Sequence, residues 1–159
     1  MNKIGLLLAL VVLLLAACGE NGTARSPAQP SNPAREAGES IGLDIPAIAV
    51  HVDKLQEFKL SGEGKYNCPR DPQIAAWNRE GAVPGEPGLA LIIASGQGLF
   101  QRLDALQPVD PIYINRADGT RITFKRIGRA GTTAGARREH LQLTACGGIA
   151  VTVYAELVT

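Results

Sequence analysis

The sequence predicts an all-β domain, a closed or half-closed antiparallel β-barrel of seven to eight strands with one or two short helices. Three observations predict this fold class. Apolar residues alternate with small or polar residues in many short segments, which is the period of a half-buried strand. Clusters of Gly, Pro, Asn and Asp separate these segments, as turns do. Helical spacing of apolar residues is confined to one short stretch, so helices contribute little to the fold.

The first half of the domain predicts strands interrupted by turns. Apolar alternation covers residues 41–45, stops at Pro46 and resumes over residues 48–52. A further short apolar segment, 55–60, precedes a turn-rich stretch. Residues 73–78 predict one short helical turn that ends near Trp77.

The second half contains the clearest local signals. Residues 89–94 are continuously apolar, which predicts a strand covered on both faces, and residues 99–106 have the spacing of a short amphipathic helix. The Asp118-Gly119 pair lies between two strand-like segments and predicts a β-hairpin. A loop is then expected over residues 129–139. Two closing strands follow it, joined by Gly147-Gly148; they are predicted over residues 141–146 and 150–158.

The amino terminus predicts export and a lipid anchor. Lys3 precedes an apolar run of 14 residues, 4–17, which is too short for a comfortable membrane span and is typical of a signal peptide. The run ends in Leu-Ala-Ala before Cys18, which resembles the cleavage box of bacterial lipoproteins. By that resemblance the chain divides into a signal peptide (1–17), a lipidated Cys18 with its tether (18–39), and a folded domain (40–159).

The tether and the charge balance limit the classes of partner. Residues 19–39 are rich in Pro, Ala, Ser, Asn and Gly, a composition that does not fold, and their 21 residues span roughly 27 Å root-mean-square. Without Lys3, 15 basic side chains stand against 15 acidic ones. This neutrality argues against nucleic acid as a partner. No cofactor is expected, and no metal either, because the two histidines and the cysteines lack ligand spacing.

Cys146 is the residue with the clearest chemical potential. It ends a predicted strand and is followed by Gly147-Gly148, an arrangement that presents a thiol at the end of a sheet strand. A free thiol with a pKa near 8.5 is only a few per cent thiolate at neutral pH, so catalysis needs a base or a nearby positive charge.

Six segments occur in the order seen in sortases, and the chain resembles most closely a degenerate member of class F (class E/F-like). They are an Ile-Pro-Ala-Ile opening strand, a proline-flanked turn ending in an aromatic residue, a Pro-Gly-Glu-Pro-Gly loop before an apolar strand, a Phe-x-x-Leu helix, the Leu-Thr-Ala-Cys strand and a last strand. Their residues are 45–50, 69–77, 84–88, 99–103, 143–148 and 151–155.

The resemblance implies a barrel-shaped cysteine transpeptidase that acts on sorting-signal peptides with a Cys nucleophile, a His acid–base and an oxyanion-stabilising Arg. Only the nucleophile carries over, onto Cys146. Ser95 occupies the position expected for His, and residues 147–159 contain no Arg or Lys where the Arg is expected. Six other residues could in principle replace the missing His or Arg, but each has an ordinary explanation as a surface residue. They are His51, His140, Arg102, Arg121, Arg126 and Arg129.

Three functions therefore remain open. We expect a membrane-anchored extracytoplasmic lipoprotein that is catalytically impaired and acts by binding a cell-wall peptide or an envelope protein. The first alternative is an active, divergent sortase-type transpeptidase or hydrolase that uses Cys146 with an unusual helper. The second is a structural module closed by a Cys68–Cys146 disulfide, since these two cysteines remain in an oxidising compartment once Cys18 is lipidated.

Overall fold

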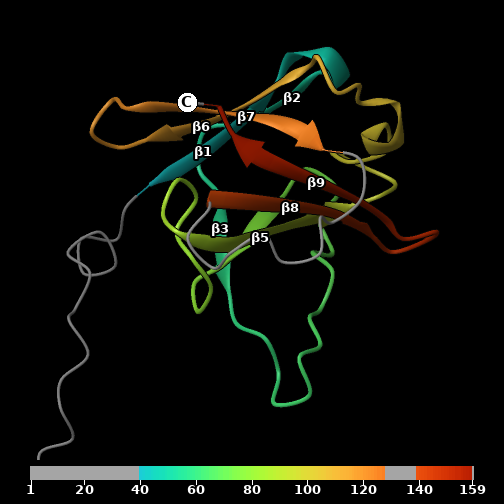
Figure 1. Cartoon of the computed structure of the whole chain (residues 1–159). Helices are drawn as coiled ribbons and strands as arrows, with labels where there is room; N and C mark the ends of the chain where they lie inside the picture. Colours follow the sequence, from blue (N-terminus) through green and yellow to red (C-terminus); the bar gives the residue numbers. More distant parts are fainter. Residues whose placement is uncertain (1–39, 128–138, 159) are drawn as a thin grey trace, which may run out of the picture. The chain divides into compact units, whose positions relative to one another are not determined.

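The computed structural model describes residues 40–127 and 139–158, and its regular secondary structure is almost entirely β-strand (Figure 1). A single nine-stranded sheet runs in the order β2-β1-β6-β7-β9-β8-β5-β4-β3. Two 3₁₀ helices complete the described elements. In chain order these are β1 (Ile41–Ile45), η1 (Pro46–Ile48), β2 (Val50–Val52), β3 (Gln56–Phe58), β4 (Ala75–Asn78), β5 (Gly88–Ser95), η2 (Leu103–Ala105), β6 (Pro111–Arg116), β7 (Arg121–Ile127), β8 (Glu139–Cys146) and β9 (Val151–Leu157).

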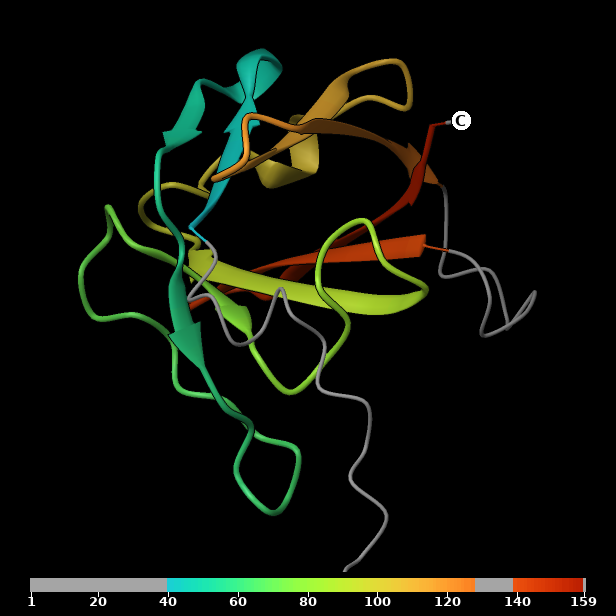
Figure 2. The same ribbon diagram turned by 90° about the vertical axis from the view of Figure 1, so that its left-hand side faces the viewer.

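The sheet curls into a half-barrel, which confirms the predicted fold class. Figure 2 shows β1, β6 and β7 lying over β5, β8 and β9, with the segment that contains η2 between the two halves. Most strand pairs are antiparallel, but β5 pairs with β8 and β3 pairs with β4 in parallel. The nine strands exceed the predicted seven to eight because two of them, β2 and β3, are only three residues long.

The core fills the inside of this curl. Its side chains are aliphatic and aromatic, and they come from the inward-facing positions of the long strands and from the segment around η2. Twelve large side chains are essentially removed from solvent: Phe100, Phe124, Ile41, Leu43, Ile45, Ile92, Ile93, Leu103, Leu106, Ile112, Ile114 and Leu141. All of them except Ile93 belong to the core cluster. At about 1.5–3 kcal/mol for each fully buried side chain, their burial is the main favourable term in folding.

Local turn chemistry positions two elements as the sequence predicts. The β6–β7 hairpin turns at Asp118-Gly119, where Gly119 has φ 84°, and the Arg116 amide donates to the Thr120 carbonyl across the turn. Pro46 ends β1 and begins η1, in agreement with the predicted interruption. The continuously apolar segment forms most of β5, which lies between β4 and β8.

Two predictions of helix need correction. Residues 73–78 were expected to form a helical turn, but Ala75–Asn78 is strand β4, whose four residues are all buried because β3 and β5 flank it. Residues 99–106 do not form an α-helix either. Phe100, Leu103 and Leu106 are three residues apart, which matches the 3₁₀ period, and successive turns close through bonds such as Leu103 N–H to Phe100 O.

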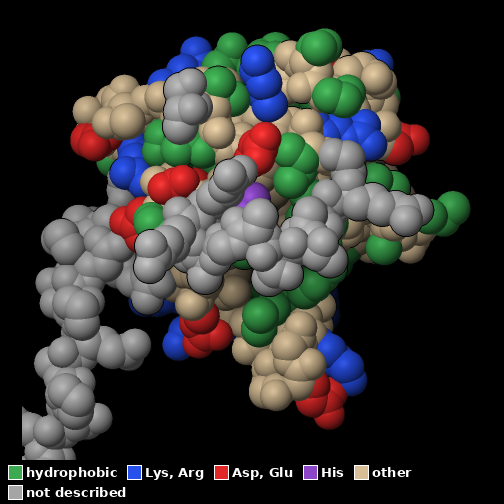
Figure 3. Space-filling view, in the orientation of Figure 1, with side chains coloured by type: hydrophobic (Ala, Val, Ile, Leu, Met, Phe, Trp, Pro, Cys, Tyr) green, Lys and Arg blue, Asp and Glu red, His purple; other side chains and the backbone are tan. Residues whose placement is uncertain are grey.

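The predicted loop at 129–139 lies outside the described residues except for Glu139, which begins β8. The signal peptide, Cys18 and the tether also lie outside them. Within the described ranges, no helix is long and apolar enough to cross a membrane. The face of the molecule in Figure 3 carries interspersed basic and acidic side chains rather than a large region of one sign.

Candidate functional site

Cys146 is the last residue of β8 and lies between two strands. The parallel register with β5 places Ser95 directly beside Cys146, and the antiparallel register with β9 pairs Ala145 with Val151. Cys146 is buried, with 9% of its surface exposed. The backbone ties these strand ends together, because the Gly96 N–H donates to the Cys146 carbonyl at 2.7 Å.

The sulfur of Cys146 forms a disulfide with Cys68. The two residues are 78 apart in sequence, and their Cα atoms are 5.7 Å apart. Cys68 belongs to the long connection between β3 and β4, so the disulfide fixes this connection to the end of β8. The Cys146 Sγ also lies 3.3 Å from the carbonyl oxygen of Ala94.

Ser95 lies where the resemblance to sortases requires a histidine, and its hydroxyl has a structural contact. Its Oγ accepts a hydrogen bond from the Gln97 N–H at 3.2 Å, within the turn that follows β5. A serine hydroxyl neither accepts a proton near neutral pH nor becomes cationic, so it does not perform the acid–base work of an imidazole. The neighbour of Cys146 on β5 therefore supplies no base.

Neither histidine is paired with Cys146. His140 lies on the same strand six residues earlier, opposite Leu89 and Glu156, and strand geometry puts it about 20 Å away. His51 lies on β2, which four strands separate from β8 in the sheet order.

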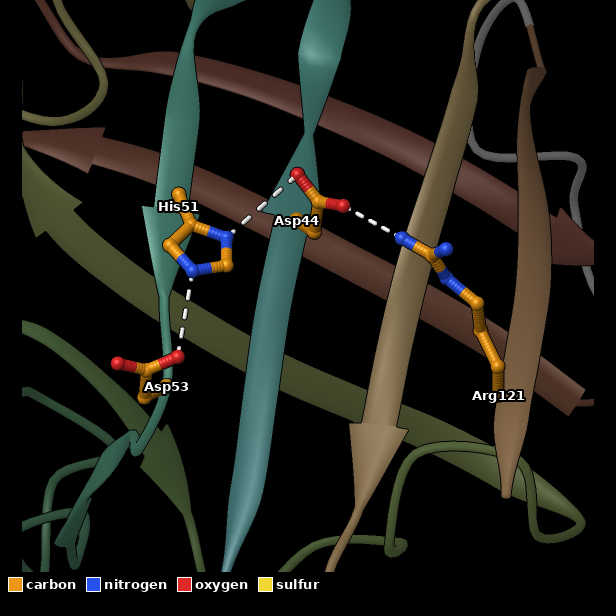
Figure 4. A network of polar contacts seen from close by, with 4 residues as sticks. All are labelled: Asp44, His51, Asp53 and Arg121. Carbon is orange, nitrogen blue, oxygen red and sulfur yellow. Dashed lines mark hydrogen bonds and ion pairs between the residues drawn. The ribbon is translucent and has the colours of Figure 1, made fainter. Parts of the chain in front are cut away.

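His51 belongs to a separate polar network on the outside of β1 and β2. Its Nδ1 lies 3.8 Å from Oδ1 of Asp44, and its Nε2 lies 3.2 Å from Oδ1 of Asp53 (Figure 4). Its side chain is 68% exposed. His51 therefore belongs to an exposed contact network on β1 and β2 and not to the surroundings of Cys146.

The arginines proposed as substitutes are engaged elsewhere or exposed. The Arg121 guanidinium pairs with Asp44 and lies 3.9 Å from the centre of the Tyr113 ring. Arg126 donates a hydrogen bond to the Leu106 carbonyl. Arg102 is exposed just before η2. Arg129 lies outside the described residues.

A row of polar side chains continues from Cys146 along β8 and was not singled out from the sequence. Gln142 donates from Nε2 to the Thr144 hydroxyl at 3.1 Å, and the hydroxyls of Thr144 and Thr152 are 3.4 Å apart. Thr144 is 2% exposed and lies on the same face as Cys146. The alternation of Gln142, Thr144 and Cys146 with apolar residues was the available signal, since a strand places every second residue on one face.

The described residues offer no metal site. Across residues 40–127 and 139–158, no group of three or more His, Cys, Asp or Glu side chains is arranged to hold an ion.

Solved structures similar to this chain are sortases. Sortase A from Corynebacterium diphtheriae matches with a TM-score of 0.54 and 17% identity, over 76% of this chain and 60% of that protein. A Clostridium perfringens sortase D5 transpeptidase matches with a TM-score of 0.57 and 18% identity, over 76% and 79% of the two chains. Sortase E from Streptomyces avermitilis matches with a TM-score of 0.53 and 15% identity, over 75% and 87%.

These matches show that the domain has the sortase fold. They come from several sortase classes, and identities of 15–18% identify the fold rather than the activity. The chain spans about 60% of the length of the Corynebacterium enzyme. Neither a scan against protein-family models nor a search of curated proteins found a match.

Proposed function

We propose that this chain is a degenerate, class F-like sortase-fold module of the bacterial cell envelope that has lost cysteine-based catalysis and acts by binding. A lipid on Cys18 would hold it outside the cytoplasm at the membrane, and a cell-wall peptide or an envelope protein would be its ligand. The observation that carries this proposal is the pairing at the strand ends: Ser95 lies beside Cys146, whose sulfur is bonded to Cys68.

The chemistry of the sulfur supports the loss of catalysis in both redox states. While the disulfide is intact, Cys146 has no thiolate with which to attack a peptide. After reduction, Ser95 beside Cys146 offers no base to deprotonate the thiol. A missing oxyanion donor costs on the order of 10²–10³ in rate, and a missing base typically 10²–10⁴.

Turnover of a sorting-signal peptide tests this proposal directly. The full chain carrying Cys18→Ser, in detergent, is incubated with an LPxTG-type peptide and an amine acceptor, with and without reductant, beside an active sortase. We expect no product in either state. Product that appears under reductant and disappears in Cys146→Ala would instead establish an active enzyme.

Binding needs its own measurement. We expect the same protein to co-sediment with insoluble peptidoglycan or to capture a peptide fragment of it. If it neither turns over nor binds, the binding proposal fails, and the structural disulfide module remains as the explanation of the Cys68–Cys146 pair.

An active, divergent sortase is the second candidate, and the fold similarity to a sortase D5 transpeptidase favours it. It would need reduction of the Cys68–Cys146 bond. It would also need a base or a cation beside Cys146 other than the histidines and arginines described above. The reductant-dependent arm of the turnover assay distinguishes this candidate from the first.

Membrane anchoring is tested independently of the domain. Cells expressing the full chain are labelled with a radioactive or clickable fatty acid, and Cys18→Ala is the matched control. We expect label on the wild-type chain and none on the variant; equal labelling of both would exclude a lipid anchor at Cys18.

A further inference from the structure

The two sulfurs of the disulfide have unequal surroundings. Cys68 lies on the connection between β3 and β4 and is partly exposed, whereas Cys146 is 9% exposed at the end of β8. The Cys146 Sγ also has the Ala94 carbonyl oxygen 3.3 Å away. An incoming thiolate therefore reaches Cys68 more easily than Cys146, and access is one of the factors that decide which sulfur is attacked.

The residues that follow Cys146 bring no side chain against the Cys68 sulfur. Gly147 and Gly148 are exposed and have no side chains. A Cβ atom at Gly147 would lie 3.5 Å from the Cys68 Sγ, and Gly147 has φ 81°, a conformation that favours glycine. A larger side chain at this position would cover the sulfur, whereas a Cβ at Gly148 would meet nothing within 4 Å.

The connection is anchored beyond Cys68 without help from the disulfide. The Leu99 N–H donates to the Pro72 carbonyl at 2.9 Å. Gly98 packs so closely against Pro72 that a Cβ there would lie 2.1 Å from the Pro72 oxygen. Opening the disulfide would therefore release the residues around Cys68 while the chain from Pro72 onward stays in place, and exchange does not require unfolding of the sheet.

We infer that Cys68 is the exchange site through which a dithiol oxidoreductase of the thioredoxin type, with a Cys-x-x-Cys pair, makes and breaks this disulfide. In reduction, the enzyme's thiolate attacks the Cys68 Sγ, the Cys68–Cys146 bond breaks, and Cys146 leaves as a thiolate that takes a proton. The second thiol of the enzyme then attacks the sulfur of the enzyme's first cysteine in the mixed disulfide. This step releases the Cys68 thiol and leaves the Cys-x-x-Cys pair of the enzyme oxidised. Oxidation is the reverse sequence and starts from an oxidised enzyme pair.

Such exchange would control access to the strand ends at Ser95 and Cys146. The inference depends on the disulfide and not on the loss of catalysis, so it stands or falls separately from the proposed function.

The experiment traps the mixed disulfide. The full chain carrying Cys18→Ser is mixed with a thioredoxin in which the second cysteine of the Cys-x-x-Cys pair is replaced by serine, and the conjugate is mapped by mass spectrometry. We expect the conjugate on Cys68 in about tenfold or greater excess over Cys146, because attack follows access. Gly147→Asn, a residue that tolerates φ 81°, should slow conjugation, whereas Gly148→Asn should not.

Two further measurements keep the result independent of folding. Cys146→Ala should leave a Cys68 thiol that reacts faster with Ellman's reagent than the Cys146 thiol of Cys68→Ala. Hydrogen exchange should rise on reduction more at residues 65–70 than in β5 and β8, whose amides should change only by the loss of global stability measured in urea. A conjugate mainly on Cys146, no conjugate on either cysteine, or exchange that rises no more at residues 65–70 than in β5 and β8 would overturn the inference.

Discussion

Removal of the Cys68–Cys146 disulfide is expected to destabilise the domain substantially. The bond closes a segment with a sequence separation of 78 residues. The chain-entropy relation gives about 4.5 kcal/mol for a loop of this length, and native disulfides typically contribute about 2–4 kcal/mol. For a folded part of roughly 120 residues, with an unfolding entropy of about 2.1 cal/mol/K per residue, a loss of 2–4.5 kcal/mol lowers Tm by about 8–18 °C.

The assay compares the oxidised protein with Cys68→Ala/Cys146→Ala by urea and thermal unfolding followed by circular dichroism. Removal of both cysteines avoids leaving one thiol unpaired, and Cys18→Ser, which changes a cysteine outside the described part of the chain, is the matched control. The reduced wild-type chain should unfold close to the double variant. A difference below about 1 kcal/mol between oxidised protein and double variant would refute the reasoning, because the bond would then impose little constraint on the unfolded chain.

Three further predictions follow from particular contacts. Gly98→Ala should cost about 1–3 kcal/mol in urea unfolding because its Cβ would collide with the Pro72 carbonyl, whereas Gly62→Ala, with nothing within 4 Å, should be nearly neutral; equal effects would contradict the packing argument. In a Cys68→Ala background, Ser95→His should raise the rate of Cys146 alkylation near neutral pH by up to about tenfold, since an imidazolium beside the sulfur favours the thiolate, while Ser95→Ala should not. The pKa of Asp118 is lowered chiefly by the Thr120 backbone N–H and then by the Thr120 hydroxyl, so the stabilisation is present at neutral pH and is lost as the pH falls through this lowered pKa. Asp118→Ala should therefore be less stable than wild type at pH 7 in chemical unfolding, with a difference that shrinks in acid; a difference that does not depend on pH would exclude this origin.

The parts of the fold that depend on local chemistry were predictable from the sequence. Asp118-Gly119 specifies its hairpin, and Pro46 specifies the end of β1, because turn residues act over a few positions. The strand β4 was not predictable in this way. Its residues have no strong strand pattern, and their extended conformation depends on pairing with Glu57 and neighbours in β3 and with Ile93 and neighbours in β5.

The spacing of the apolar residues before β6 was informative, but the inferred period was wrong. Phe100, Leu103 and Leu106 are buried as the pattern requires, yet they lie on successive 3₁₀ turns rather than on an α-helix. In so short a segment, a spacing of three residues fits both the α-helical period and the 3₁₀ period. The core positions could therefore be predicted, and the backbone conformation could not.

The candidate site was predictable in position but not in bonding. Cys146 at a strand end and Ser95 at the end of an apolar strand were both identifiable from sequence, and the register brings them together. The bond between Cys68 and Cys146 was not identifiable from sequence, because a disulfide needs Cα atoms within about 7 Å and a sequence contains no distances. The structure places these Cα atoms 5.7 Å apart.

The contacts that build the strand ends do not require the chemistry that the sortase fold elsewhere supports. The Gly96 amide bonds the Cys146 carbonyl, and the core beneath consists of side chains such as Ile92 and Leu143, none of which depends on an imidazole or a guanidinium. These contacts can therefore hold the strand ends together without an imidazole or a guanidinium beside Cys146. For the same reason, similarity of fold gives no measure of activity in this chain. The identities of the side chains beside Cys146, and the redox state of its sulfur, decide that question.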